Sequence, residues 1–267
     1  MSPIVVVFDF DRTIIDGDSD NWVVTHMGLT HLFQQLISTM PWNPLMNRMM
    51  EELYLQGKTI EDIAECLKQM ALDSHIVSAI KAAHSMGCDL RLVSDANQFF
   101  IETILKQHQL LDYFTEIITN PTLVDNGQLR IFPYHDFRLS PHGCTRCPTN
   151  MCKGMILEHI QVEADEKGKK TFIYLGDGGG DYCPSLRLRK DDQVMPRKGF
   201  PLWDRIQSNP SLVQANVHEW SSAEELERIL THLISGVLID GDNPNCTSSS
   251  PSLTETSAQN TIVPTVE

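Results

Sequence analysis

Two aspartates near the N-terminus are the residues best placed to do chemistry. Asp9 and Asp11 follow an apolar, β-branched run over residues 4–8, which predicts a buried strand of a parallel sheet. Side chains two residues apart on an extended segment point to the same side, and open α/β sheets bind ligands at the carboxyl ends of their strands. Because adjacent carboxylates repel, they need a cation or a shared proton. The pair therefore predicts a site for magnesium and phosphate.

Three other segments carry chemistry that matches this pair. Ser94 ends the second predicted strand and could donate its hydroxyl to a phosphate oxygen, although serine is equally suited to capping a helix. Lys153 begins a predicted helix, where an ammonium group adds to an anion site favoured by the helix dipole. Asp177 and Asp181, in the glycine-rich segment 176–181, offer hard oxygen ligands for Mg²⁺.

The order of these motifs is informative. Asp-x-Asp-x-Thr, Ser, Lys and Gly-Asp-Gly-x-x-Asp follow one another as in the haloacid dehalogenase superfamily of aspartyl-phosphate phosphatases, which the chain resembles. Further segments are similar to its phosphoethanolamine/phosphocholine phosphatase family: Asp16, 18–20, 40–43, 94–97, 144–152 and 176–184. The residues in these motifs are most similar to those of plant members, some of which are described as inorganic pyrophosphatases or thiamine phosphate phosphatases. The resemblance spans about residues 4–235.

The resemblance implies a reaction and roles for the residues. Asp9 would be the nucleophile that forms an aspartyl-phosphate, and Asp11 would be the proton donor and then the general base. Ser94 and Lys153 would bind the other phosphoryl oxygens, with Lys153 stabilising the transition state. We expect Arg12 to point away from the metal, because side chains alternate along a strand.

The same resemblance implies how Mg²⁺ would be held. Its protein ligands would be Asp9, the backbone carbonyl of Asp11, and Asp177, while Asp181 would bind directly or through water. Few protein ligands are enough, because Mg²⁺ usually keeps several waters.

Substrate choice is expected to depend on Asp20 and Asp95, which the resemblance assigns to the leaving group. Two carboxylates away from the metal can hold an ammonium or quaternary ammonium group. Trp22 or Trp42 could add a cation–π face, although a tryptophan in such a helical segment is more often part of its core. The same acidic pocket would accept pyrophosphate only if a second Mg²⁺ bridged it to the distal phosphate.

We therefore predict a Mg²⁺-dependent phosphatase acting on small phosphorylated metabolites of the phosphoethanolamine or phosphocholine type. Inorganic pyrophosphatase and thiamine monophosphate phosphatase activities are alternatives. A mutase-like phosphotransferase and a catalytically silent protein that binds a phosphate ligand remain open as well.

A cysteine-rich loop precedes Lys153. Cys144 and Cys147 form a Cys-x-x-Cys pair, and with Cys152 and His142 they have the spacing of a structural Zn²⁺ site. A loop of reduced, packed cysteines is the other interpretation of this spacing.

Composition narrows the class of protein. The chain has 267 residues, and 21 Lys and Arg against 35 Asp and Glu give it a formal net charge of −14. This acidity argues against a nucleic-acid partner. No stretch is apolar enough to span a membrane and no signal-peptide pattern is present, so we expect a cytoplasmic protein with reduced cysteines. The oligomeric state is not predicted.

The alternation of strands and helices predicts an α/β fold with a doubly wound parallel sheet, a Rossmann-like core. We assign residues 1–16 and 75–238 to this core, 17–74 to a small helical cap inserted after the first strand, and 239–267 to a disordered tail. The residues 125–127, Asp-Asn-Gly, predict a hairpin. Predicted strands are 4–8, 89–93, 116–119, 171–175, 194–195 and 213–217; predicted helices are 21–37, 44–55, 59–70, 75–86, 99–108, 152–162, 202–207 and 223–234.

Overall fold

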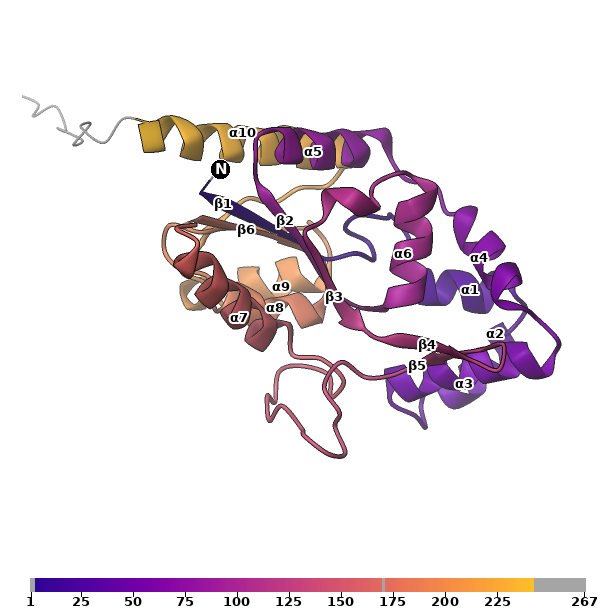
Figure 1. Ribbon diagram of the computed structural model, residues 1–267. Coiled ribbons are helices and arrows are strands. Elements are labelled where there is room, and N and C mark those ends of the chain that lie inside the picture. Colours follow the sequence, from indigo (N-terminus) through magenta and orange to yellow (C-terminus); the bar gives the residue numbers. More distant parts are fainter. Residues whose placement is uncertain (1–2, 170, 243–267) are drawn as a thin grey trace, which may run out of the picture.

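The computed structural model describes residues 3–169 and 171–242, and builds these residues around a six-stranded sheet. All of its strands pair in parallel, in the order β3-β2-β1-β6-β7-β8 (Figure 1). The strands are β1 (Ile4–Phe8), β2 (Asp89–Asn97), β3 (Glu116–Asn120), β6 (Thr171–Gly176), β7 (Gln193–Pro196) and β8 (Asn216–Val217). The predicted doubly wound α/β fold is confirmed.

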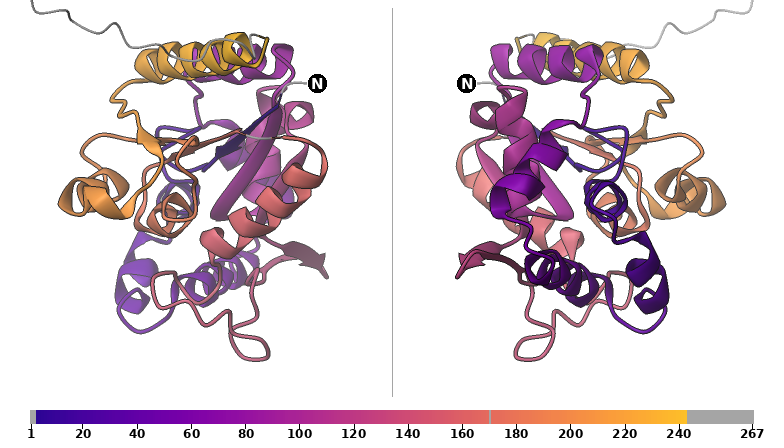
Figure 2. Two further views of the ribbon diagram at one scale, coloured as in Figure 1. Left: turned by 90° about the vertical axis from the view of Figure 1, so that its left-hand side faces the viewer. Right: turned by 90° about the vertical axis from the view of Figure 1, so that its right-hand side faces the viewer.

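Helices cover both faces of the sheet, and they bury both faces of β1. Its even-numbered residues pack with apolar residues of α5 (Ser74–Ser85), α6 (Gln98–Gln107) and α10 (Ala223–Asp242). Its odd-numbered residues pack with α7 (Lys153–Glu166) and α9 (Pro201–Ser208). This double burial explains the unbroken apolar run of β1. Figure 2 shows α5 and α10 side by side at the end of the molecule opposite the helices that follow β1.

The direction of the chain through the sheet reverses beside β1. From β1 the chain proceeds to β2 and β3 on one side, and later returns to β6 on the other side. The pairing continues one residue past the end of β1, where the Asp9 N–H donates to the Leu175 carbonyl at 2.9 Å. Such a switch point leaves a crevice at the carboxyl ends of the two strands.

The helices between β1 and α5 lie beyond the carboxyl ends of the strands, at the end of the molecule that carries the β4–β5 hairpin (Figure 1). They are α1 (Ser19–His26), α2 (Thr30–Leu36), α3 (Trp42–Leu55) and α4 (Ile60–Lys68). The hairpin of β4 (Thr122–Asp125) and β5 (Gln128–Ile131) packs against α3, and the Ile131 N–H donates to Asn47 Oδ1 at 3.0 Å. These four helices, called the cap helices below, therefore contact a segment that follows β3.

The hairpin predicted from Asp-Asn-Gly is confirmed. Asn126 and Gly127, between β4 and β5, both have positive φ angles, 50° and 82°. A two-residue type I′ turn requires positive φ at both positions, which Asn-Gly accepts most readily.

Several predicted boundaries differ from the structure; for example, β2 extends to Asn97 and α7 to Glu166. The single helix predicted over 21–37 is divided into α1 and α2, because Gly28 between them adopts a left-handed conformation with φ of 80°. The strand predicted over 213–217 is reduced to β8, since only its last two residues pair with β7. Helix α10 runs through 239–242, the start of the predicted tail, with apolar residues near its end packed on the core. The rest of that tail, 243–267, lies outside the described residues.

The remaining elements are short: η1 (Leu111–Tyr113), η2 (Gly179–Asp181), α8 (Tyr182–Ser185) and η3 (Pro210–Leu212).

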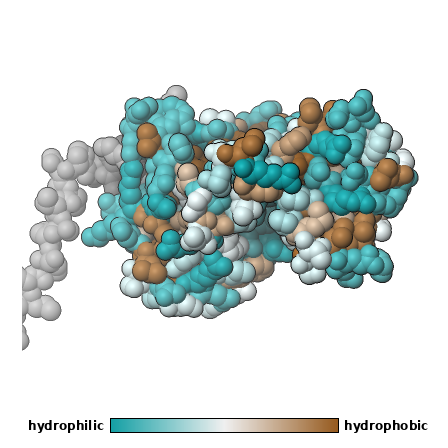
Figure 3. All heavy atoms as spheres, turned by 90° about the horizontal axis from the view of Figure 1, so that it is seen from below, coloured by the Kyte–Doolittle hydropathy of each residue, from teal (hydrophilic) through white to brown (hydrophobic). Residues whose placement is uncertain are grey.

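Within 3–169 and 171–242, no helix combines the length and the apolar character needed to cross a membrane. The face seen in Figure 3 carries hydrophobic residues in small groups scattered among hydrophilic ones.

Candidate active site

A polar pocket of about 250 Å³ lies at the carboxyl ends of β1, β2 and β6, between the sheet and the cap helices. Aspartates dominate its wall, and the described lysine and arginine side chains that line it are Lys153 and Arg12. The lining residues are Asp9, Asp11, Arg12, Asp18, Asp20, Trp42, Asp95, Ala96, Lys153, Asp177, Gly178, Gly179, Gly180 and Asp181. The pocket therefore brings together all of the predicted catalytic, metal and leaving-group residues except Ser94.

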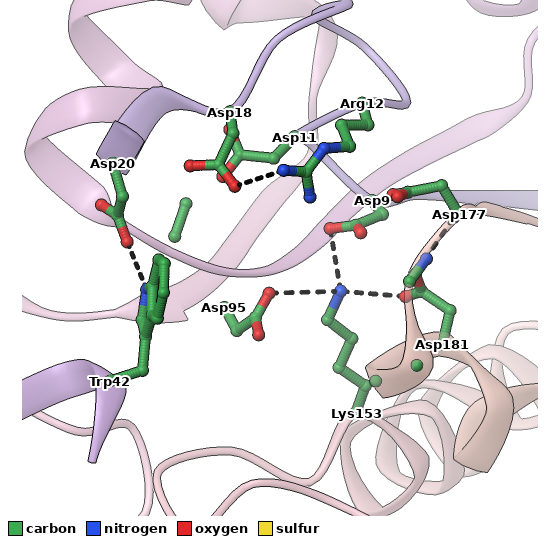
Figure 4. Close-up of a pocket in the computed structure, with 14 residues that line it drawn as sticks. Asp9, Asp11, Arg12, Asp18, Asp20, Trp42, Asp95, Lys153, Asp177 and Asp181 are labelled. Atoms are coloured by element: carbon green, nitrogen blue, oxygen red, sulfur yellow. Dashed lines mark hydrogen bonds and ion pairs between the residues drawn. The ribbon is translucent and has the colours of Figure 1, made fainter. Parts of the chain in front are cut away.

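Lys153 joins the aspartates from different strand ends (Figure 4). Its ammonium Nζ lies 2.8 Å from Asp9 Oδ1, 2.9 Å from Asp181 Oδ1 and 3.8 Å from Asp95 Oδ1. The lysine is the first residue of α7 and is buried, which by itself would lower its pKa. The carboxylates of Asp181 and Asp9 outweigh burial and raise the pKa of Lys153 well above its ordinary value. Its ammonium therefore stays charged at neutral pH.

Three carboxylates form a compact cluster beside this ammonium. One oxygen each of Asp9, Asp177 and Asp181 can be chosen so that all lie within 4.8 Å of one another, and all three residues are buried. Burial and then the neighbouring Asp181 charge raise the pKa of Asp9 well above its usual range and that of Asp177 to about 7. Hard oxygen donors whose ionised forms are destabilised in this way fit a divalent cation such as Mg²⁺.

Asp181 is fixed by more hydrogen bonds than its neighbours in the cluster. Its Oδ2 accepts the backbone N–H groups of Asp177 at 3.2 Å and Gly178 at 2.8 Å. Its Oδ1 accepts the Tyr174 hydroxyl at 2.7 Å. Although burial opposes ionisation, Lys153 and these donors hold the pKa of Asp181 below its ordinary value. The carboxylate is therefore ionised and held in one orientation.

Asp11 lies apart from this cluster and faces the cap. Its Oδ1 accepts the Ser19 backbone N–H at 2.9 Å, at the start of α1. Burial raises the pKa of Asp11 well above its ordinary value, and the carboxylates of Asp18 and Asp20 raise it further. A carboxyl group that retains its proton is suited to donate it to a leaving oxygen.

Asp20 is the buried carboxylate of the cap side of the pocket. Its Oδ2 accepts the Trp42 indole N–H at 2.6 Å, whereas Oδ1 has no hydrogen-bond partner among the described residues. Burial, followed by the Asp18 charge, raises the pKa of Asp20 to about 8. Asp95 is exposed and lines the same pocket. Of the two tryptophans considered from the sequence, Trp42 lines the pocket, while Trp22 donates to the Cys66 carbonyl of α4.

Two residues lie differently from expectation. Ser94 is fully buried and is not among the residues that line the pocket; its Oγ accepts the Ala96 N–H at 3.2 Å. The expectation that Arg12 points away was wrong: it lines the pocket and its guanidinium lies 3.2 Å from Asp18 Oδ2. The alternation argument failed because β1 ends at Phe8 and Arg12 adopts a left-handed conformation with φ of 57°.

The predicted zinc ligands are also partly wrong. Cys144, Cys147 and Cys152 come together, but the fourth member of their cluster is Cys183 rather than His142. The His142 ring accepts the Cys144 backbone N–H at Nδ1, and its Nε2 lies 2.9 Å from the Pro148 carbonyl. Both ring nitrogens are therefore engaged within the loop.

Sequence reasoning missed Tyr174 and Asp18. Tyr174 is fully buried in β6 and bonds to Asp181, and a tyrosine inside an apolar strand signals such a need, since a buried hydroxyl requires a partner. Asp18 caps α1 by accepting the Asn21 N–H at 2.9 Å, while it also pairs with Arg12. Its capping role was readable from sequence, but its contact with Arg12 was not.

The structure has the fold of haloacid dehalogenase-type phosphatases. A solved structure, the phospho-aspartyl intermediate analogue of phosphoserine phosphatase, shares the fold with a TM-score of 0.59 at 16% identity, covering 87% of this chain and 99% of that one. The family model described as "Putative Phosphatase" matches residues 4–234, so the chain belongs to that family. Enzymes of this type generally use Mg²⁺, which the buried aspartate cluster fits.

Two plant relatives are much closer in sequence. A "Thiamine phosphate phosphatase-like protein" of Arabidopsis thaliana is 59% identical over 245 residues, which cover 91% of this chain and 100% of that protein. "Inorganic pyrophosphatase 2" of Arabidopsis thaliana is 56% identical over 237 residues, 88% of this chain and 85% of that protein. The names agree on removal of phosphate from small molecules and differ in substrate.

Proposed function

We propose that this phosphatase hydrolyses small phosphorylated metabolites through an aspartyl-phosphate on Asp9, with Mg²⁺ in the aspartate cluster. The observation that supports this most directly is the contact of the Lys153 ammonium with Asp9 at 2.8 Å, beside the carboxylates of Asp177 and Asp181. A carboxylate paired with a buried cation provides a nucleophile next to a charge that can bind a phosphoryl group.

In the proposed reaction, an Asp9 oxygen attacks phosphorus in line as the bond to the leaving oxygen breaks. Asp11 gives its proton to that oxygen, and the freed product departs. Asp11 then removes a proton from water, which attacks phosphorus, releases inorganic phosphate and restores Asp9. Lys153 offsets the negative charge of the phosphoryl oxygens throughout.

The proposed Mg²⁺ would be held by Asp9, Asp177, Asp181 and the backbone carbonyl of Asp11, and it supplies positive charge next to the phosphoryl group when bound. Ser94 remains our predicted phosphate donor, because a hydroxyl that accepts the Ala96 N–H still has its own proton to donate.

For the leaving group we propose a cationic small molecule of the phosphoethanolamine or phosphocholine type. Asp20 supports this, since its Oδ1 is buried and lacks a hydrogen-bond partner among the described residues. Asp18 and Asp95 add acidic charge to the same pocket wall. A cation bound there would remove the cost of ionising Asp20.

The names of the relatives favour two further candidates, thiamine monophosphate and inorganic pyrophosphate. Thiamine monophosphate carries a cationic ring that suits the same acidic wall. Pyrophosphate is an anion, and its distal phosphate would need a second Mg²⁺ near Asp20 or Asp95.

A substrate panel tests this proposal. Free phosphate is measured with Mg²⁺ for phosphoethanolamine, phosphocholine, thiamine monophosphate, pyrophosphate, pyridoxal phosphate and p-nitrophenyl phosphate. We expect Asp9→Asn to lower kcat by at least about a thousandfold, as loss of a nucleophile does. Asp125→Asn, at an exposed strand position, is the matched control and should keep full activity. Mg²⁺-loaded protein that releases no phosphate from any of these compounds would overturn the proposal.

A further inference from the structure

Four cysteines from two separate segments meet outside the active-site pocket. Cys144 and Cys147 belong to the loop between β5 and α7, Cys152 is the N-cap of α7, and Cys183 lies in α8. Their sulfur atoms all lie within 4.8 Å of one another. Cys183 Sγ is 3.8 Å from Cys144 Sγ and 4.0 Å from Cys152 Sγ.

These separations match a mononuclear thiolate site. In a tetrahedral site with Zn–S bonds of about 2.3 Å, the sulfurs lie about 3.8 Å apart. A disulfide would place two of them about 2.05 Å apart, and all four cysteines are free. Soft thiolate ligands select zinc over Mg²⁺, so this cluster differs in chemistry from the oxygen ligands of the aspartate cluster.

We propose that these four cysteines bind one structural Zn²⁺ ion. Four protein ligands complete the tetrahedron and leave no position for a reacting water, which is the arrangement of structural rather than catalytic zinc sites. Binding converts the thiols to thiolates and releases their protons.

The loop itself supports this assignment. Residues 132–152 contain no helix or strand, and an unstructured connection of this length is uncommon in a compact domain. Three of the four cysteines lie in this segment and the fourth lies beyond β6, so the metal would fasten the loop to the core. Close packing surrounds the fourth ligand: a Cβ added at Gly154 would lie 2.5 Å from Cys183 Sγ.

Metal analysis of the full chain, purified in reducing buffer without chelator, tests the proposal. We expect about one zinc per chain in the wild type and at least a tenfold lower content in Cys144→Ser and Cys147→Ser. Cys66→Ser, a buried cysteine in α4, is the matched control and should retain the metal. Asp177→Asn should also retain it, because the aspartate cluster is a separate site. Wild-type protein without zinc after incubation with Zn²⁺ and reductant would overturn the proposal, as would full zinc content in Cys147→Ser.

A measurement on the wild type avoids dependence on variants that fail to fold. Protein loaded with Co²⁺ should show the intense d–d bands of tetrahedral cobalt together with thiolate charge-transfer absorption, and added Zn²⁺ should displace cobalt one for one. Weak octahedral cobalt bands without charge transfer would contradict the site. Disulfides between these cysteines, detected by mass in protein purified anaerobically, would contradict it as well.

Discussion

At the scale of single residues, the ionisation of Asp177 links metal binding to pH. In the folded, metal-free protein its pKa is raised to about 7 by burial and then by Asp181, whereas its ordinary value is 3.8. Ionisation of Asp177 therefore costs stability as the pH rises from about 4 to 7, and Mg²⁺ opposes that cost by binding the ionised form.

We accordingly expect Mg²⁺ to raise the Tm more at about pH 8 than at about pH 5.5. Mass action gives a stabilisation of about 2.7 kcal/mol at a hundredfold excess over Kd. Thermal unfolding with and without Mg²⁺ measures it, and Asp177→Asn should lose most of the shift while Asp125→Asn keeps it. A shift that is independent of pH would contradict the argument.

Asp20 yields the second prediction at the residue scale. Asp20→Asn should lower kcat/KM for phosphocholine at least tenfold, about 1.4 kcal/mol, because an amide does not compensate the charge of the ammonium group. The value for p-nitrophenyl phosphate, which carries no cation, should change by less than about twofold.

Trp42→Phe is the companion variant, since it keeps an aromatic side chain but removes the five-membered ring whose N–H bonds to Asp20. It should show the same selectivity in weaker form. Equal losses for both substrates in Asp20→Asn would reject a cation-binding role.

The placement of most site residues was predictable because it depends on where strands end. Asp9 follows β1 and Asp177 follows β6, and neighbouring parallel strands bring their carboxyl ends together. The positions of Ser94 and His142 were not predictable, because nearby backbone groups bind their side chains. Ser94 Oγ accepts the Ala96 N–H, and His142 Nδ1 accepts the Cys144 N–H. Such competition between nearby partners is decided by loop conformation, which the order of residue types does not determine.

At the scale of elements, the contact between α7 and α8 gives a stability prediction. Gly154→Ala would place a methyl group 2.5 Å from Cys183 Sγ and 3.3 Å from the Cys183 carbonyl carbon. Neither atom can move far, so overpacking should lower the free energy of unfolding by about 1–3 kcal/mol.

Gly236→Ala in α10 is the matched control, because no atom lies within 4 Å of its added Cβ. The gain in helix propensity should raise stability there by up to about 1 kcal/mol. Urea unfolding of both variants decides the matter, and changes of the same sign would show that the close contact does not determine the outcome.

The elements themselves were predicted unevenly. Asp-Asn-Gly identified the β4–β5 hairpin, because its turn geometry is local. The packing of that hairpin on α3 depends on Asn47 and Ile131, which are distant in the chain, so no local pattern could reveal it. The division of the first cap helix depends on Gly28, and a glycine inside a helical pattern does not always end the helix.

At the scale of the whole molecule, α5 and α10 lie side by side at the end opposite the helices that follow β1 (Figure 2), and an ion pair joins them. His75 Nδ1 lies 2.6 Å from Glu227 Oε2. The hydrogen bond to Glu227 raises the pKa of His75 above 6.5, and the same bond lowers the pKa of Glu227 below 4.5. The pair is therefore fully formed between about pH 4.5 and 6.5, and it is lost as the pH rises through the raised pKa of His75.

His75→Gln should therefore destabilise the protein most near about pH 6 and have little effect well above the raised pKa. Both side chains are partly exposed to solvent, so the effect is modest, and urea unfolding over a pH series measures it. Glu227→Gln should give the same profile in that range, and the double variant should add nothing to either. A loss that is constant with pH would contradict the assignment.

The fold class followed from the alternation of apolar strands with amphipathic helices, which reflects how a parallel sheet must be covered on both faces. The end of α10 was not predicted, because Val237 and Leu238, beyond the predicted helix, pack against the core. Tertiary contacts, rather than local propensity, determine where such a helix ends.

The β4–β5 hairpin has a consequence for protein engineering. Exchange of residues 17–74 with those of a relative would leave Ile131 facing a foreign α3 in place of Asn47. The natural unit for transplantation is therefore discontinuous and comprises that segment together with residues 122–131. Chimeras that exchange both pieces together keep the native contact between α3 and the hairpin. They are the appropriate starting point for redesigning which phosphate compounds the pocket accepts.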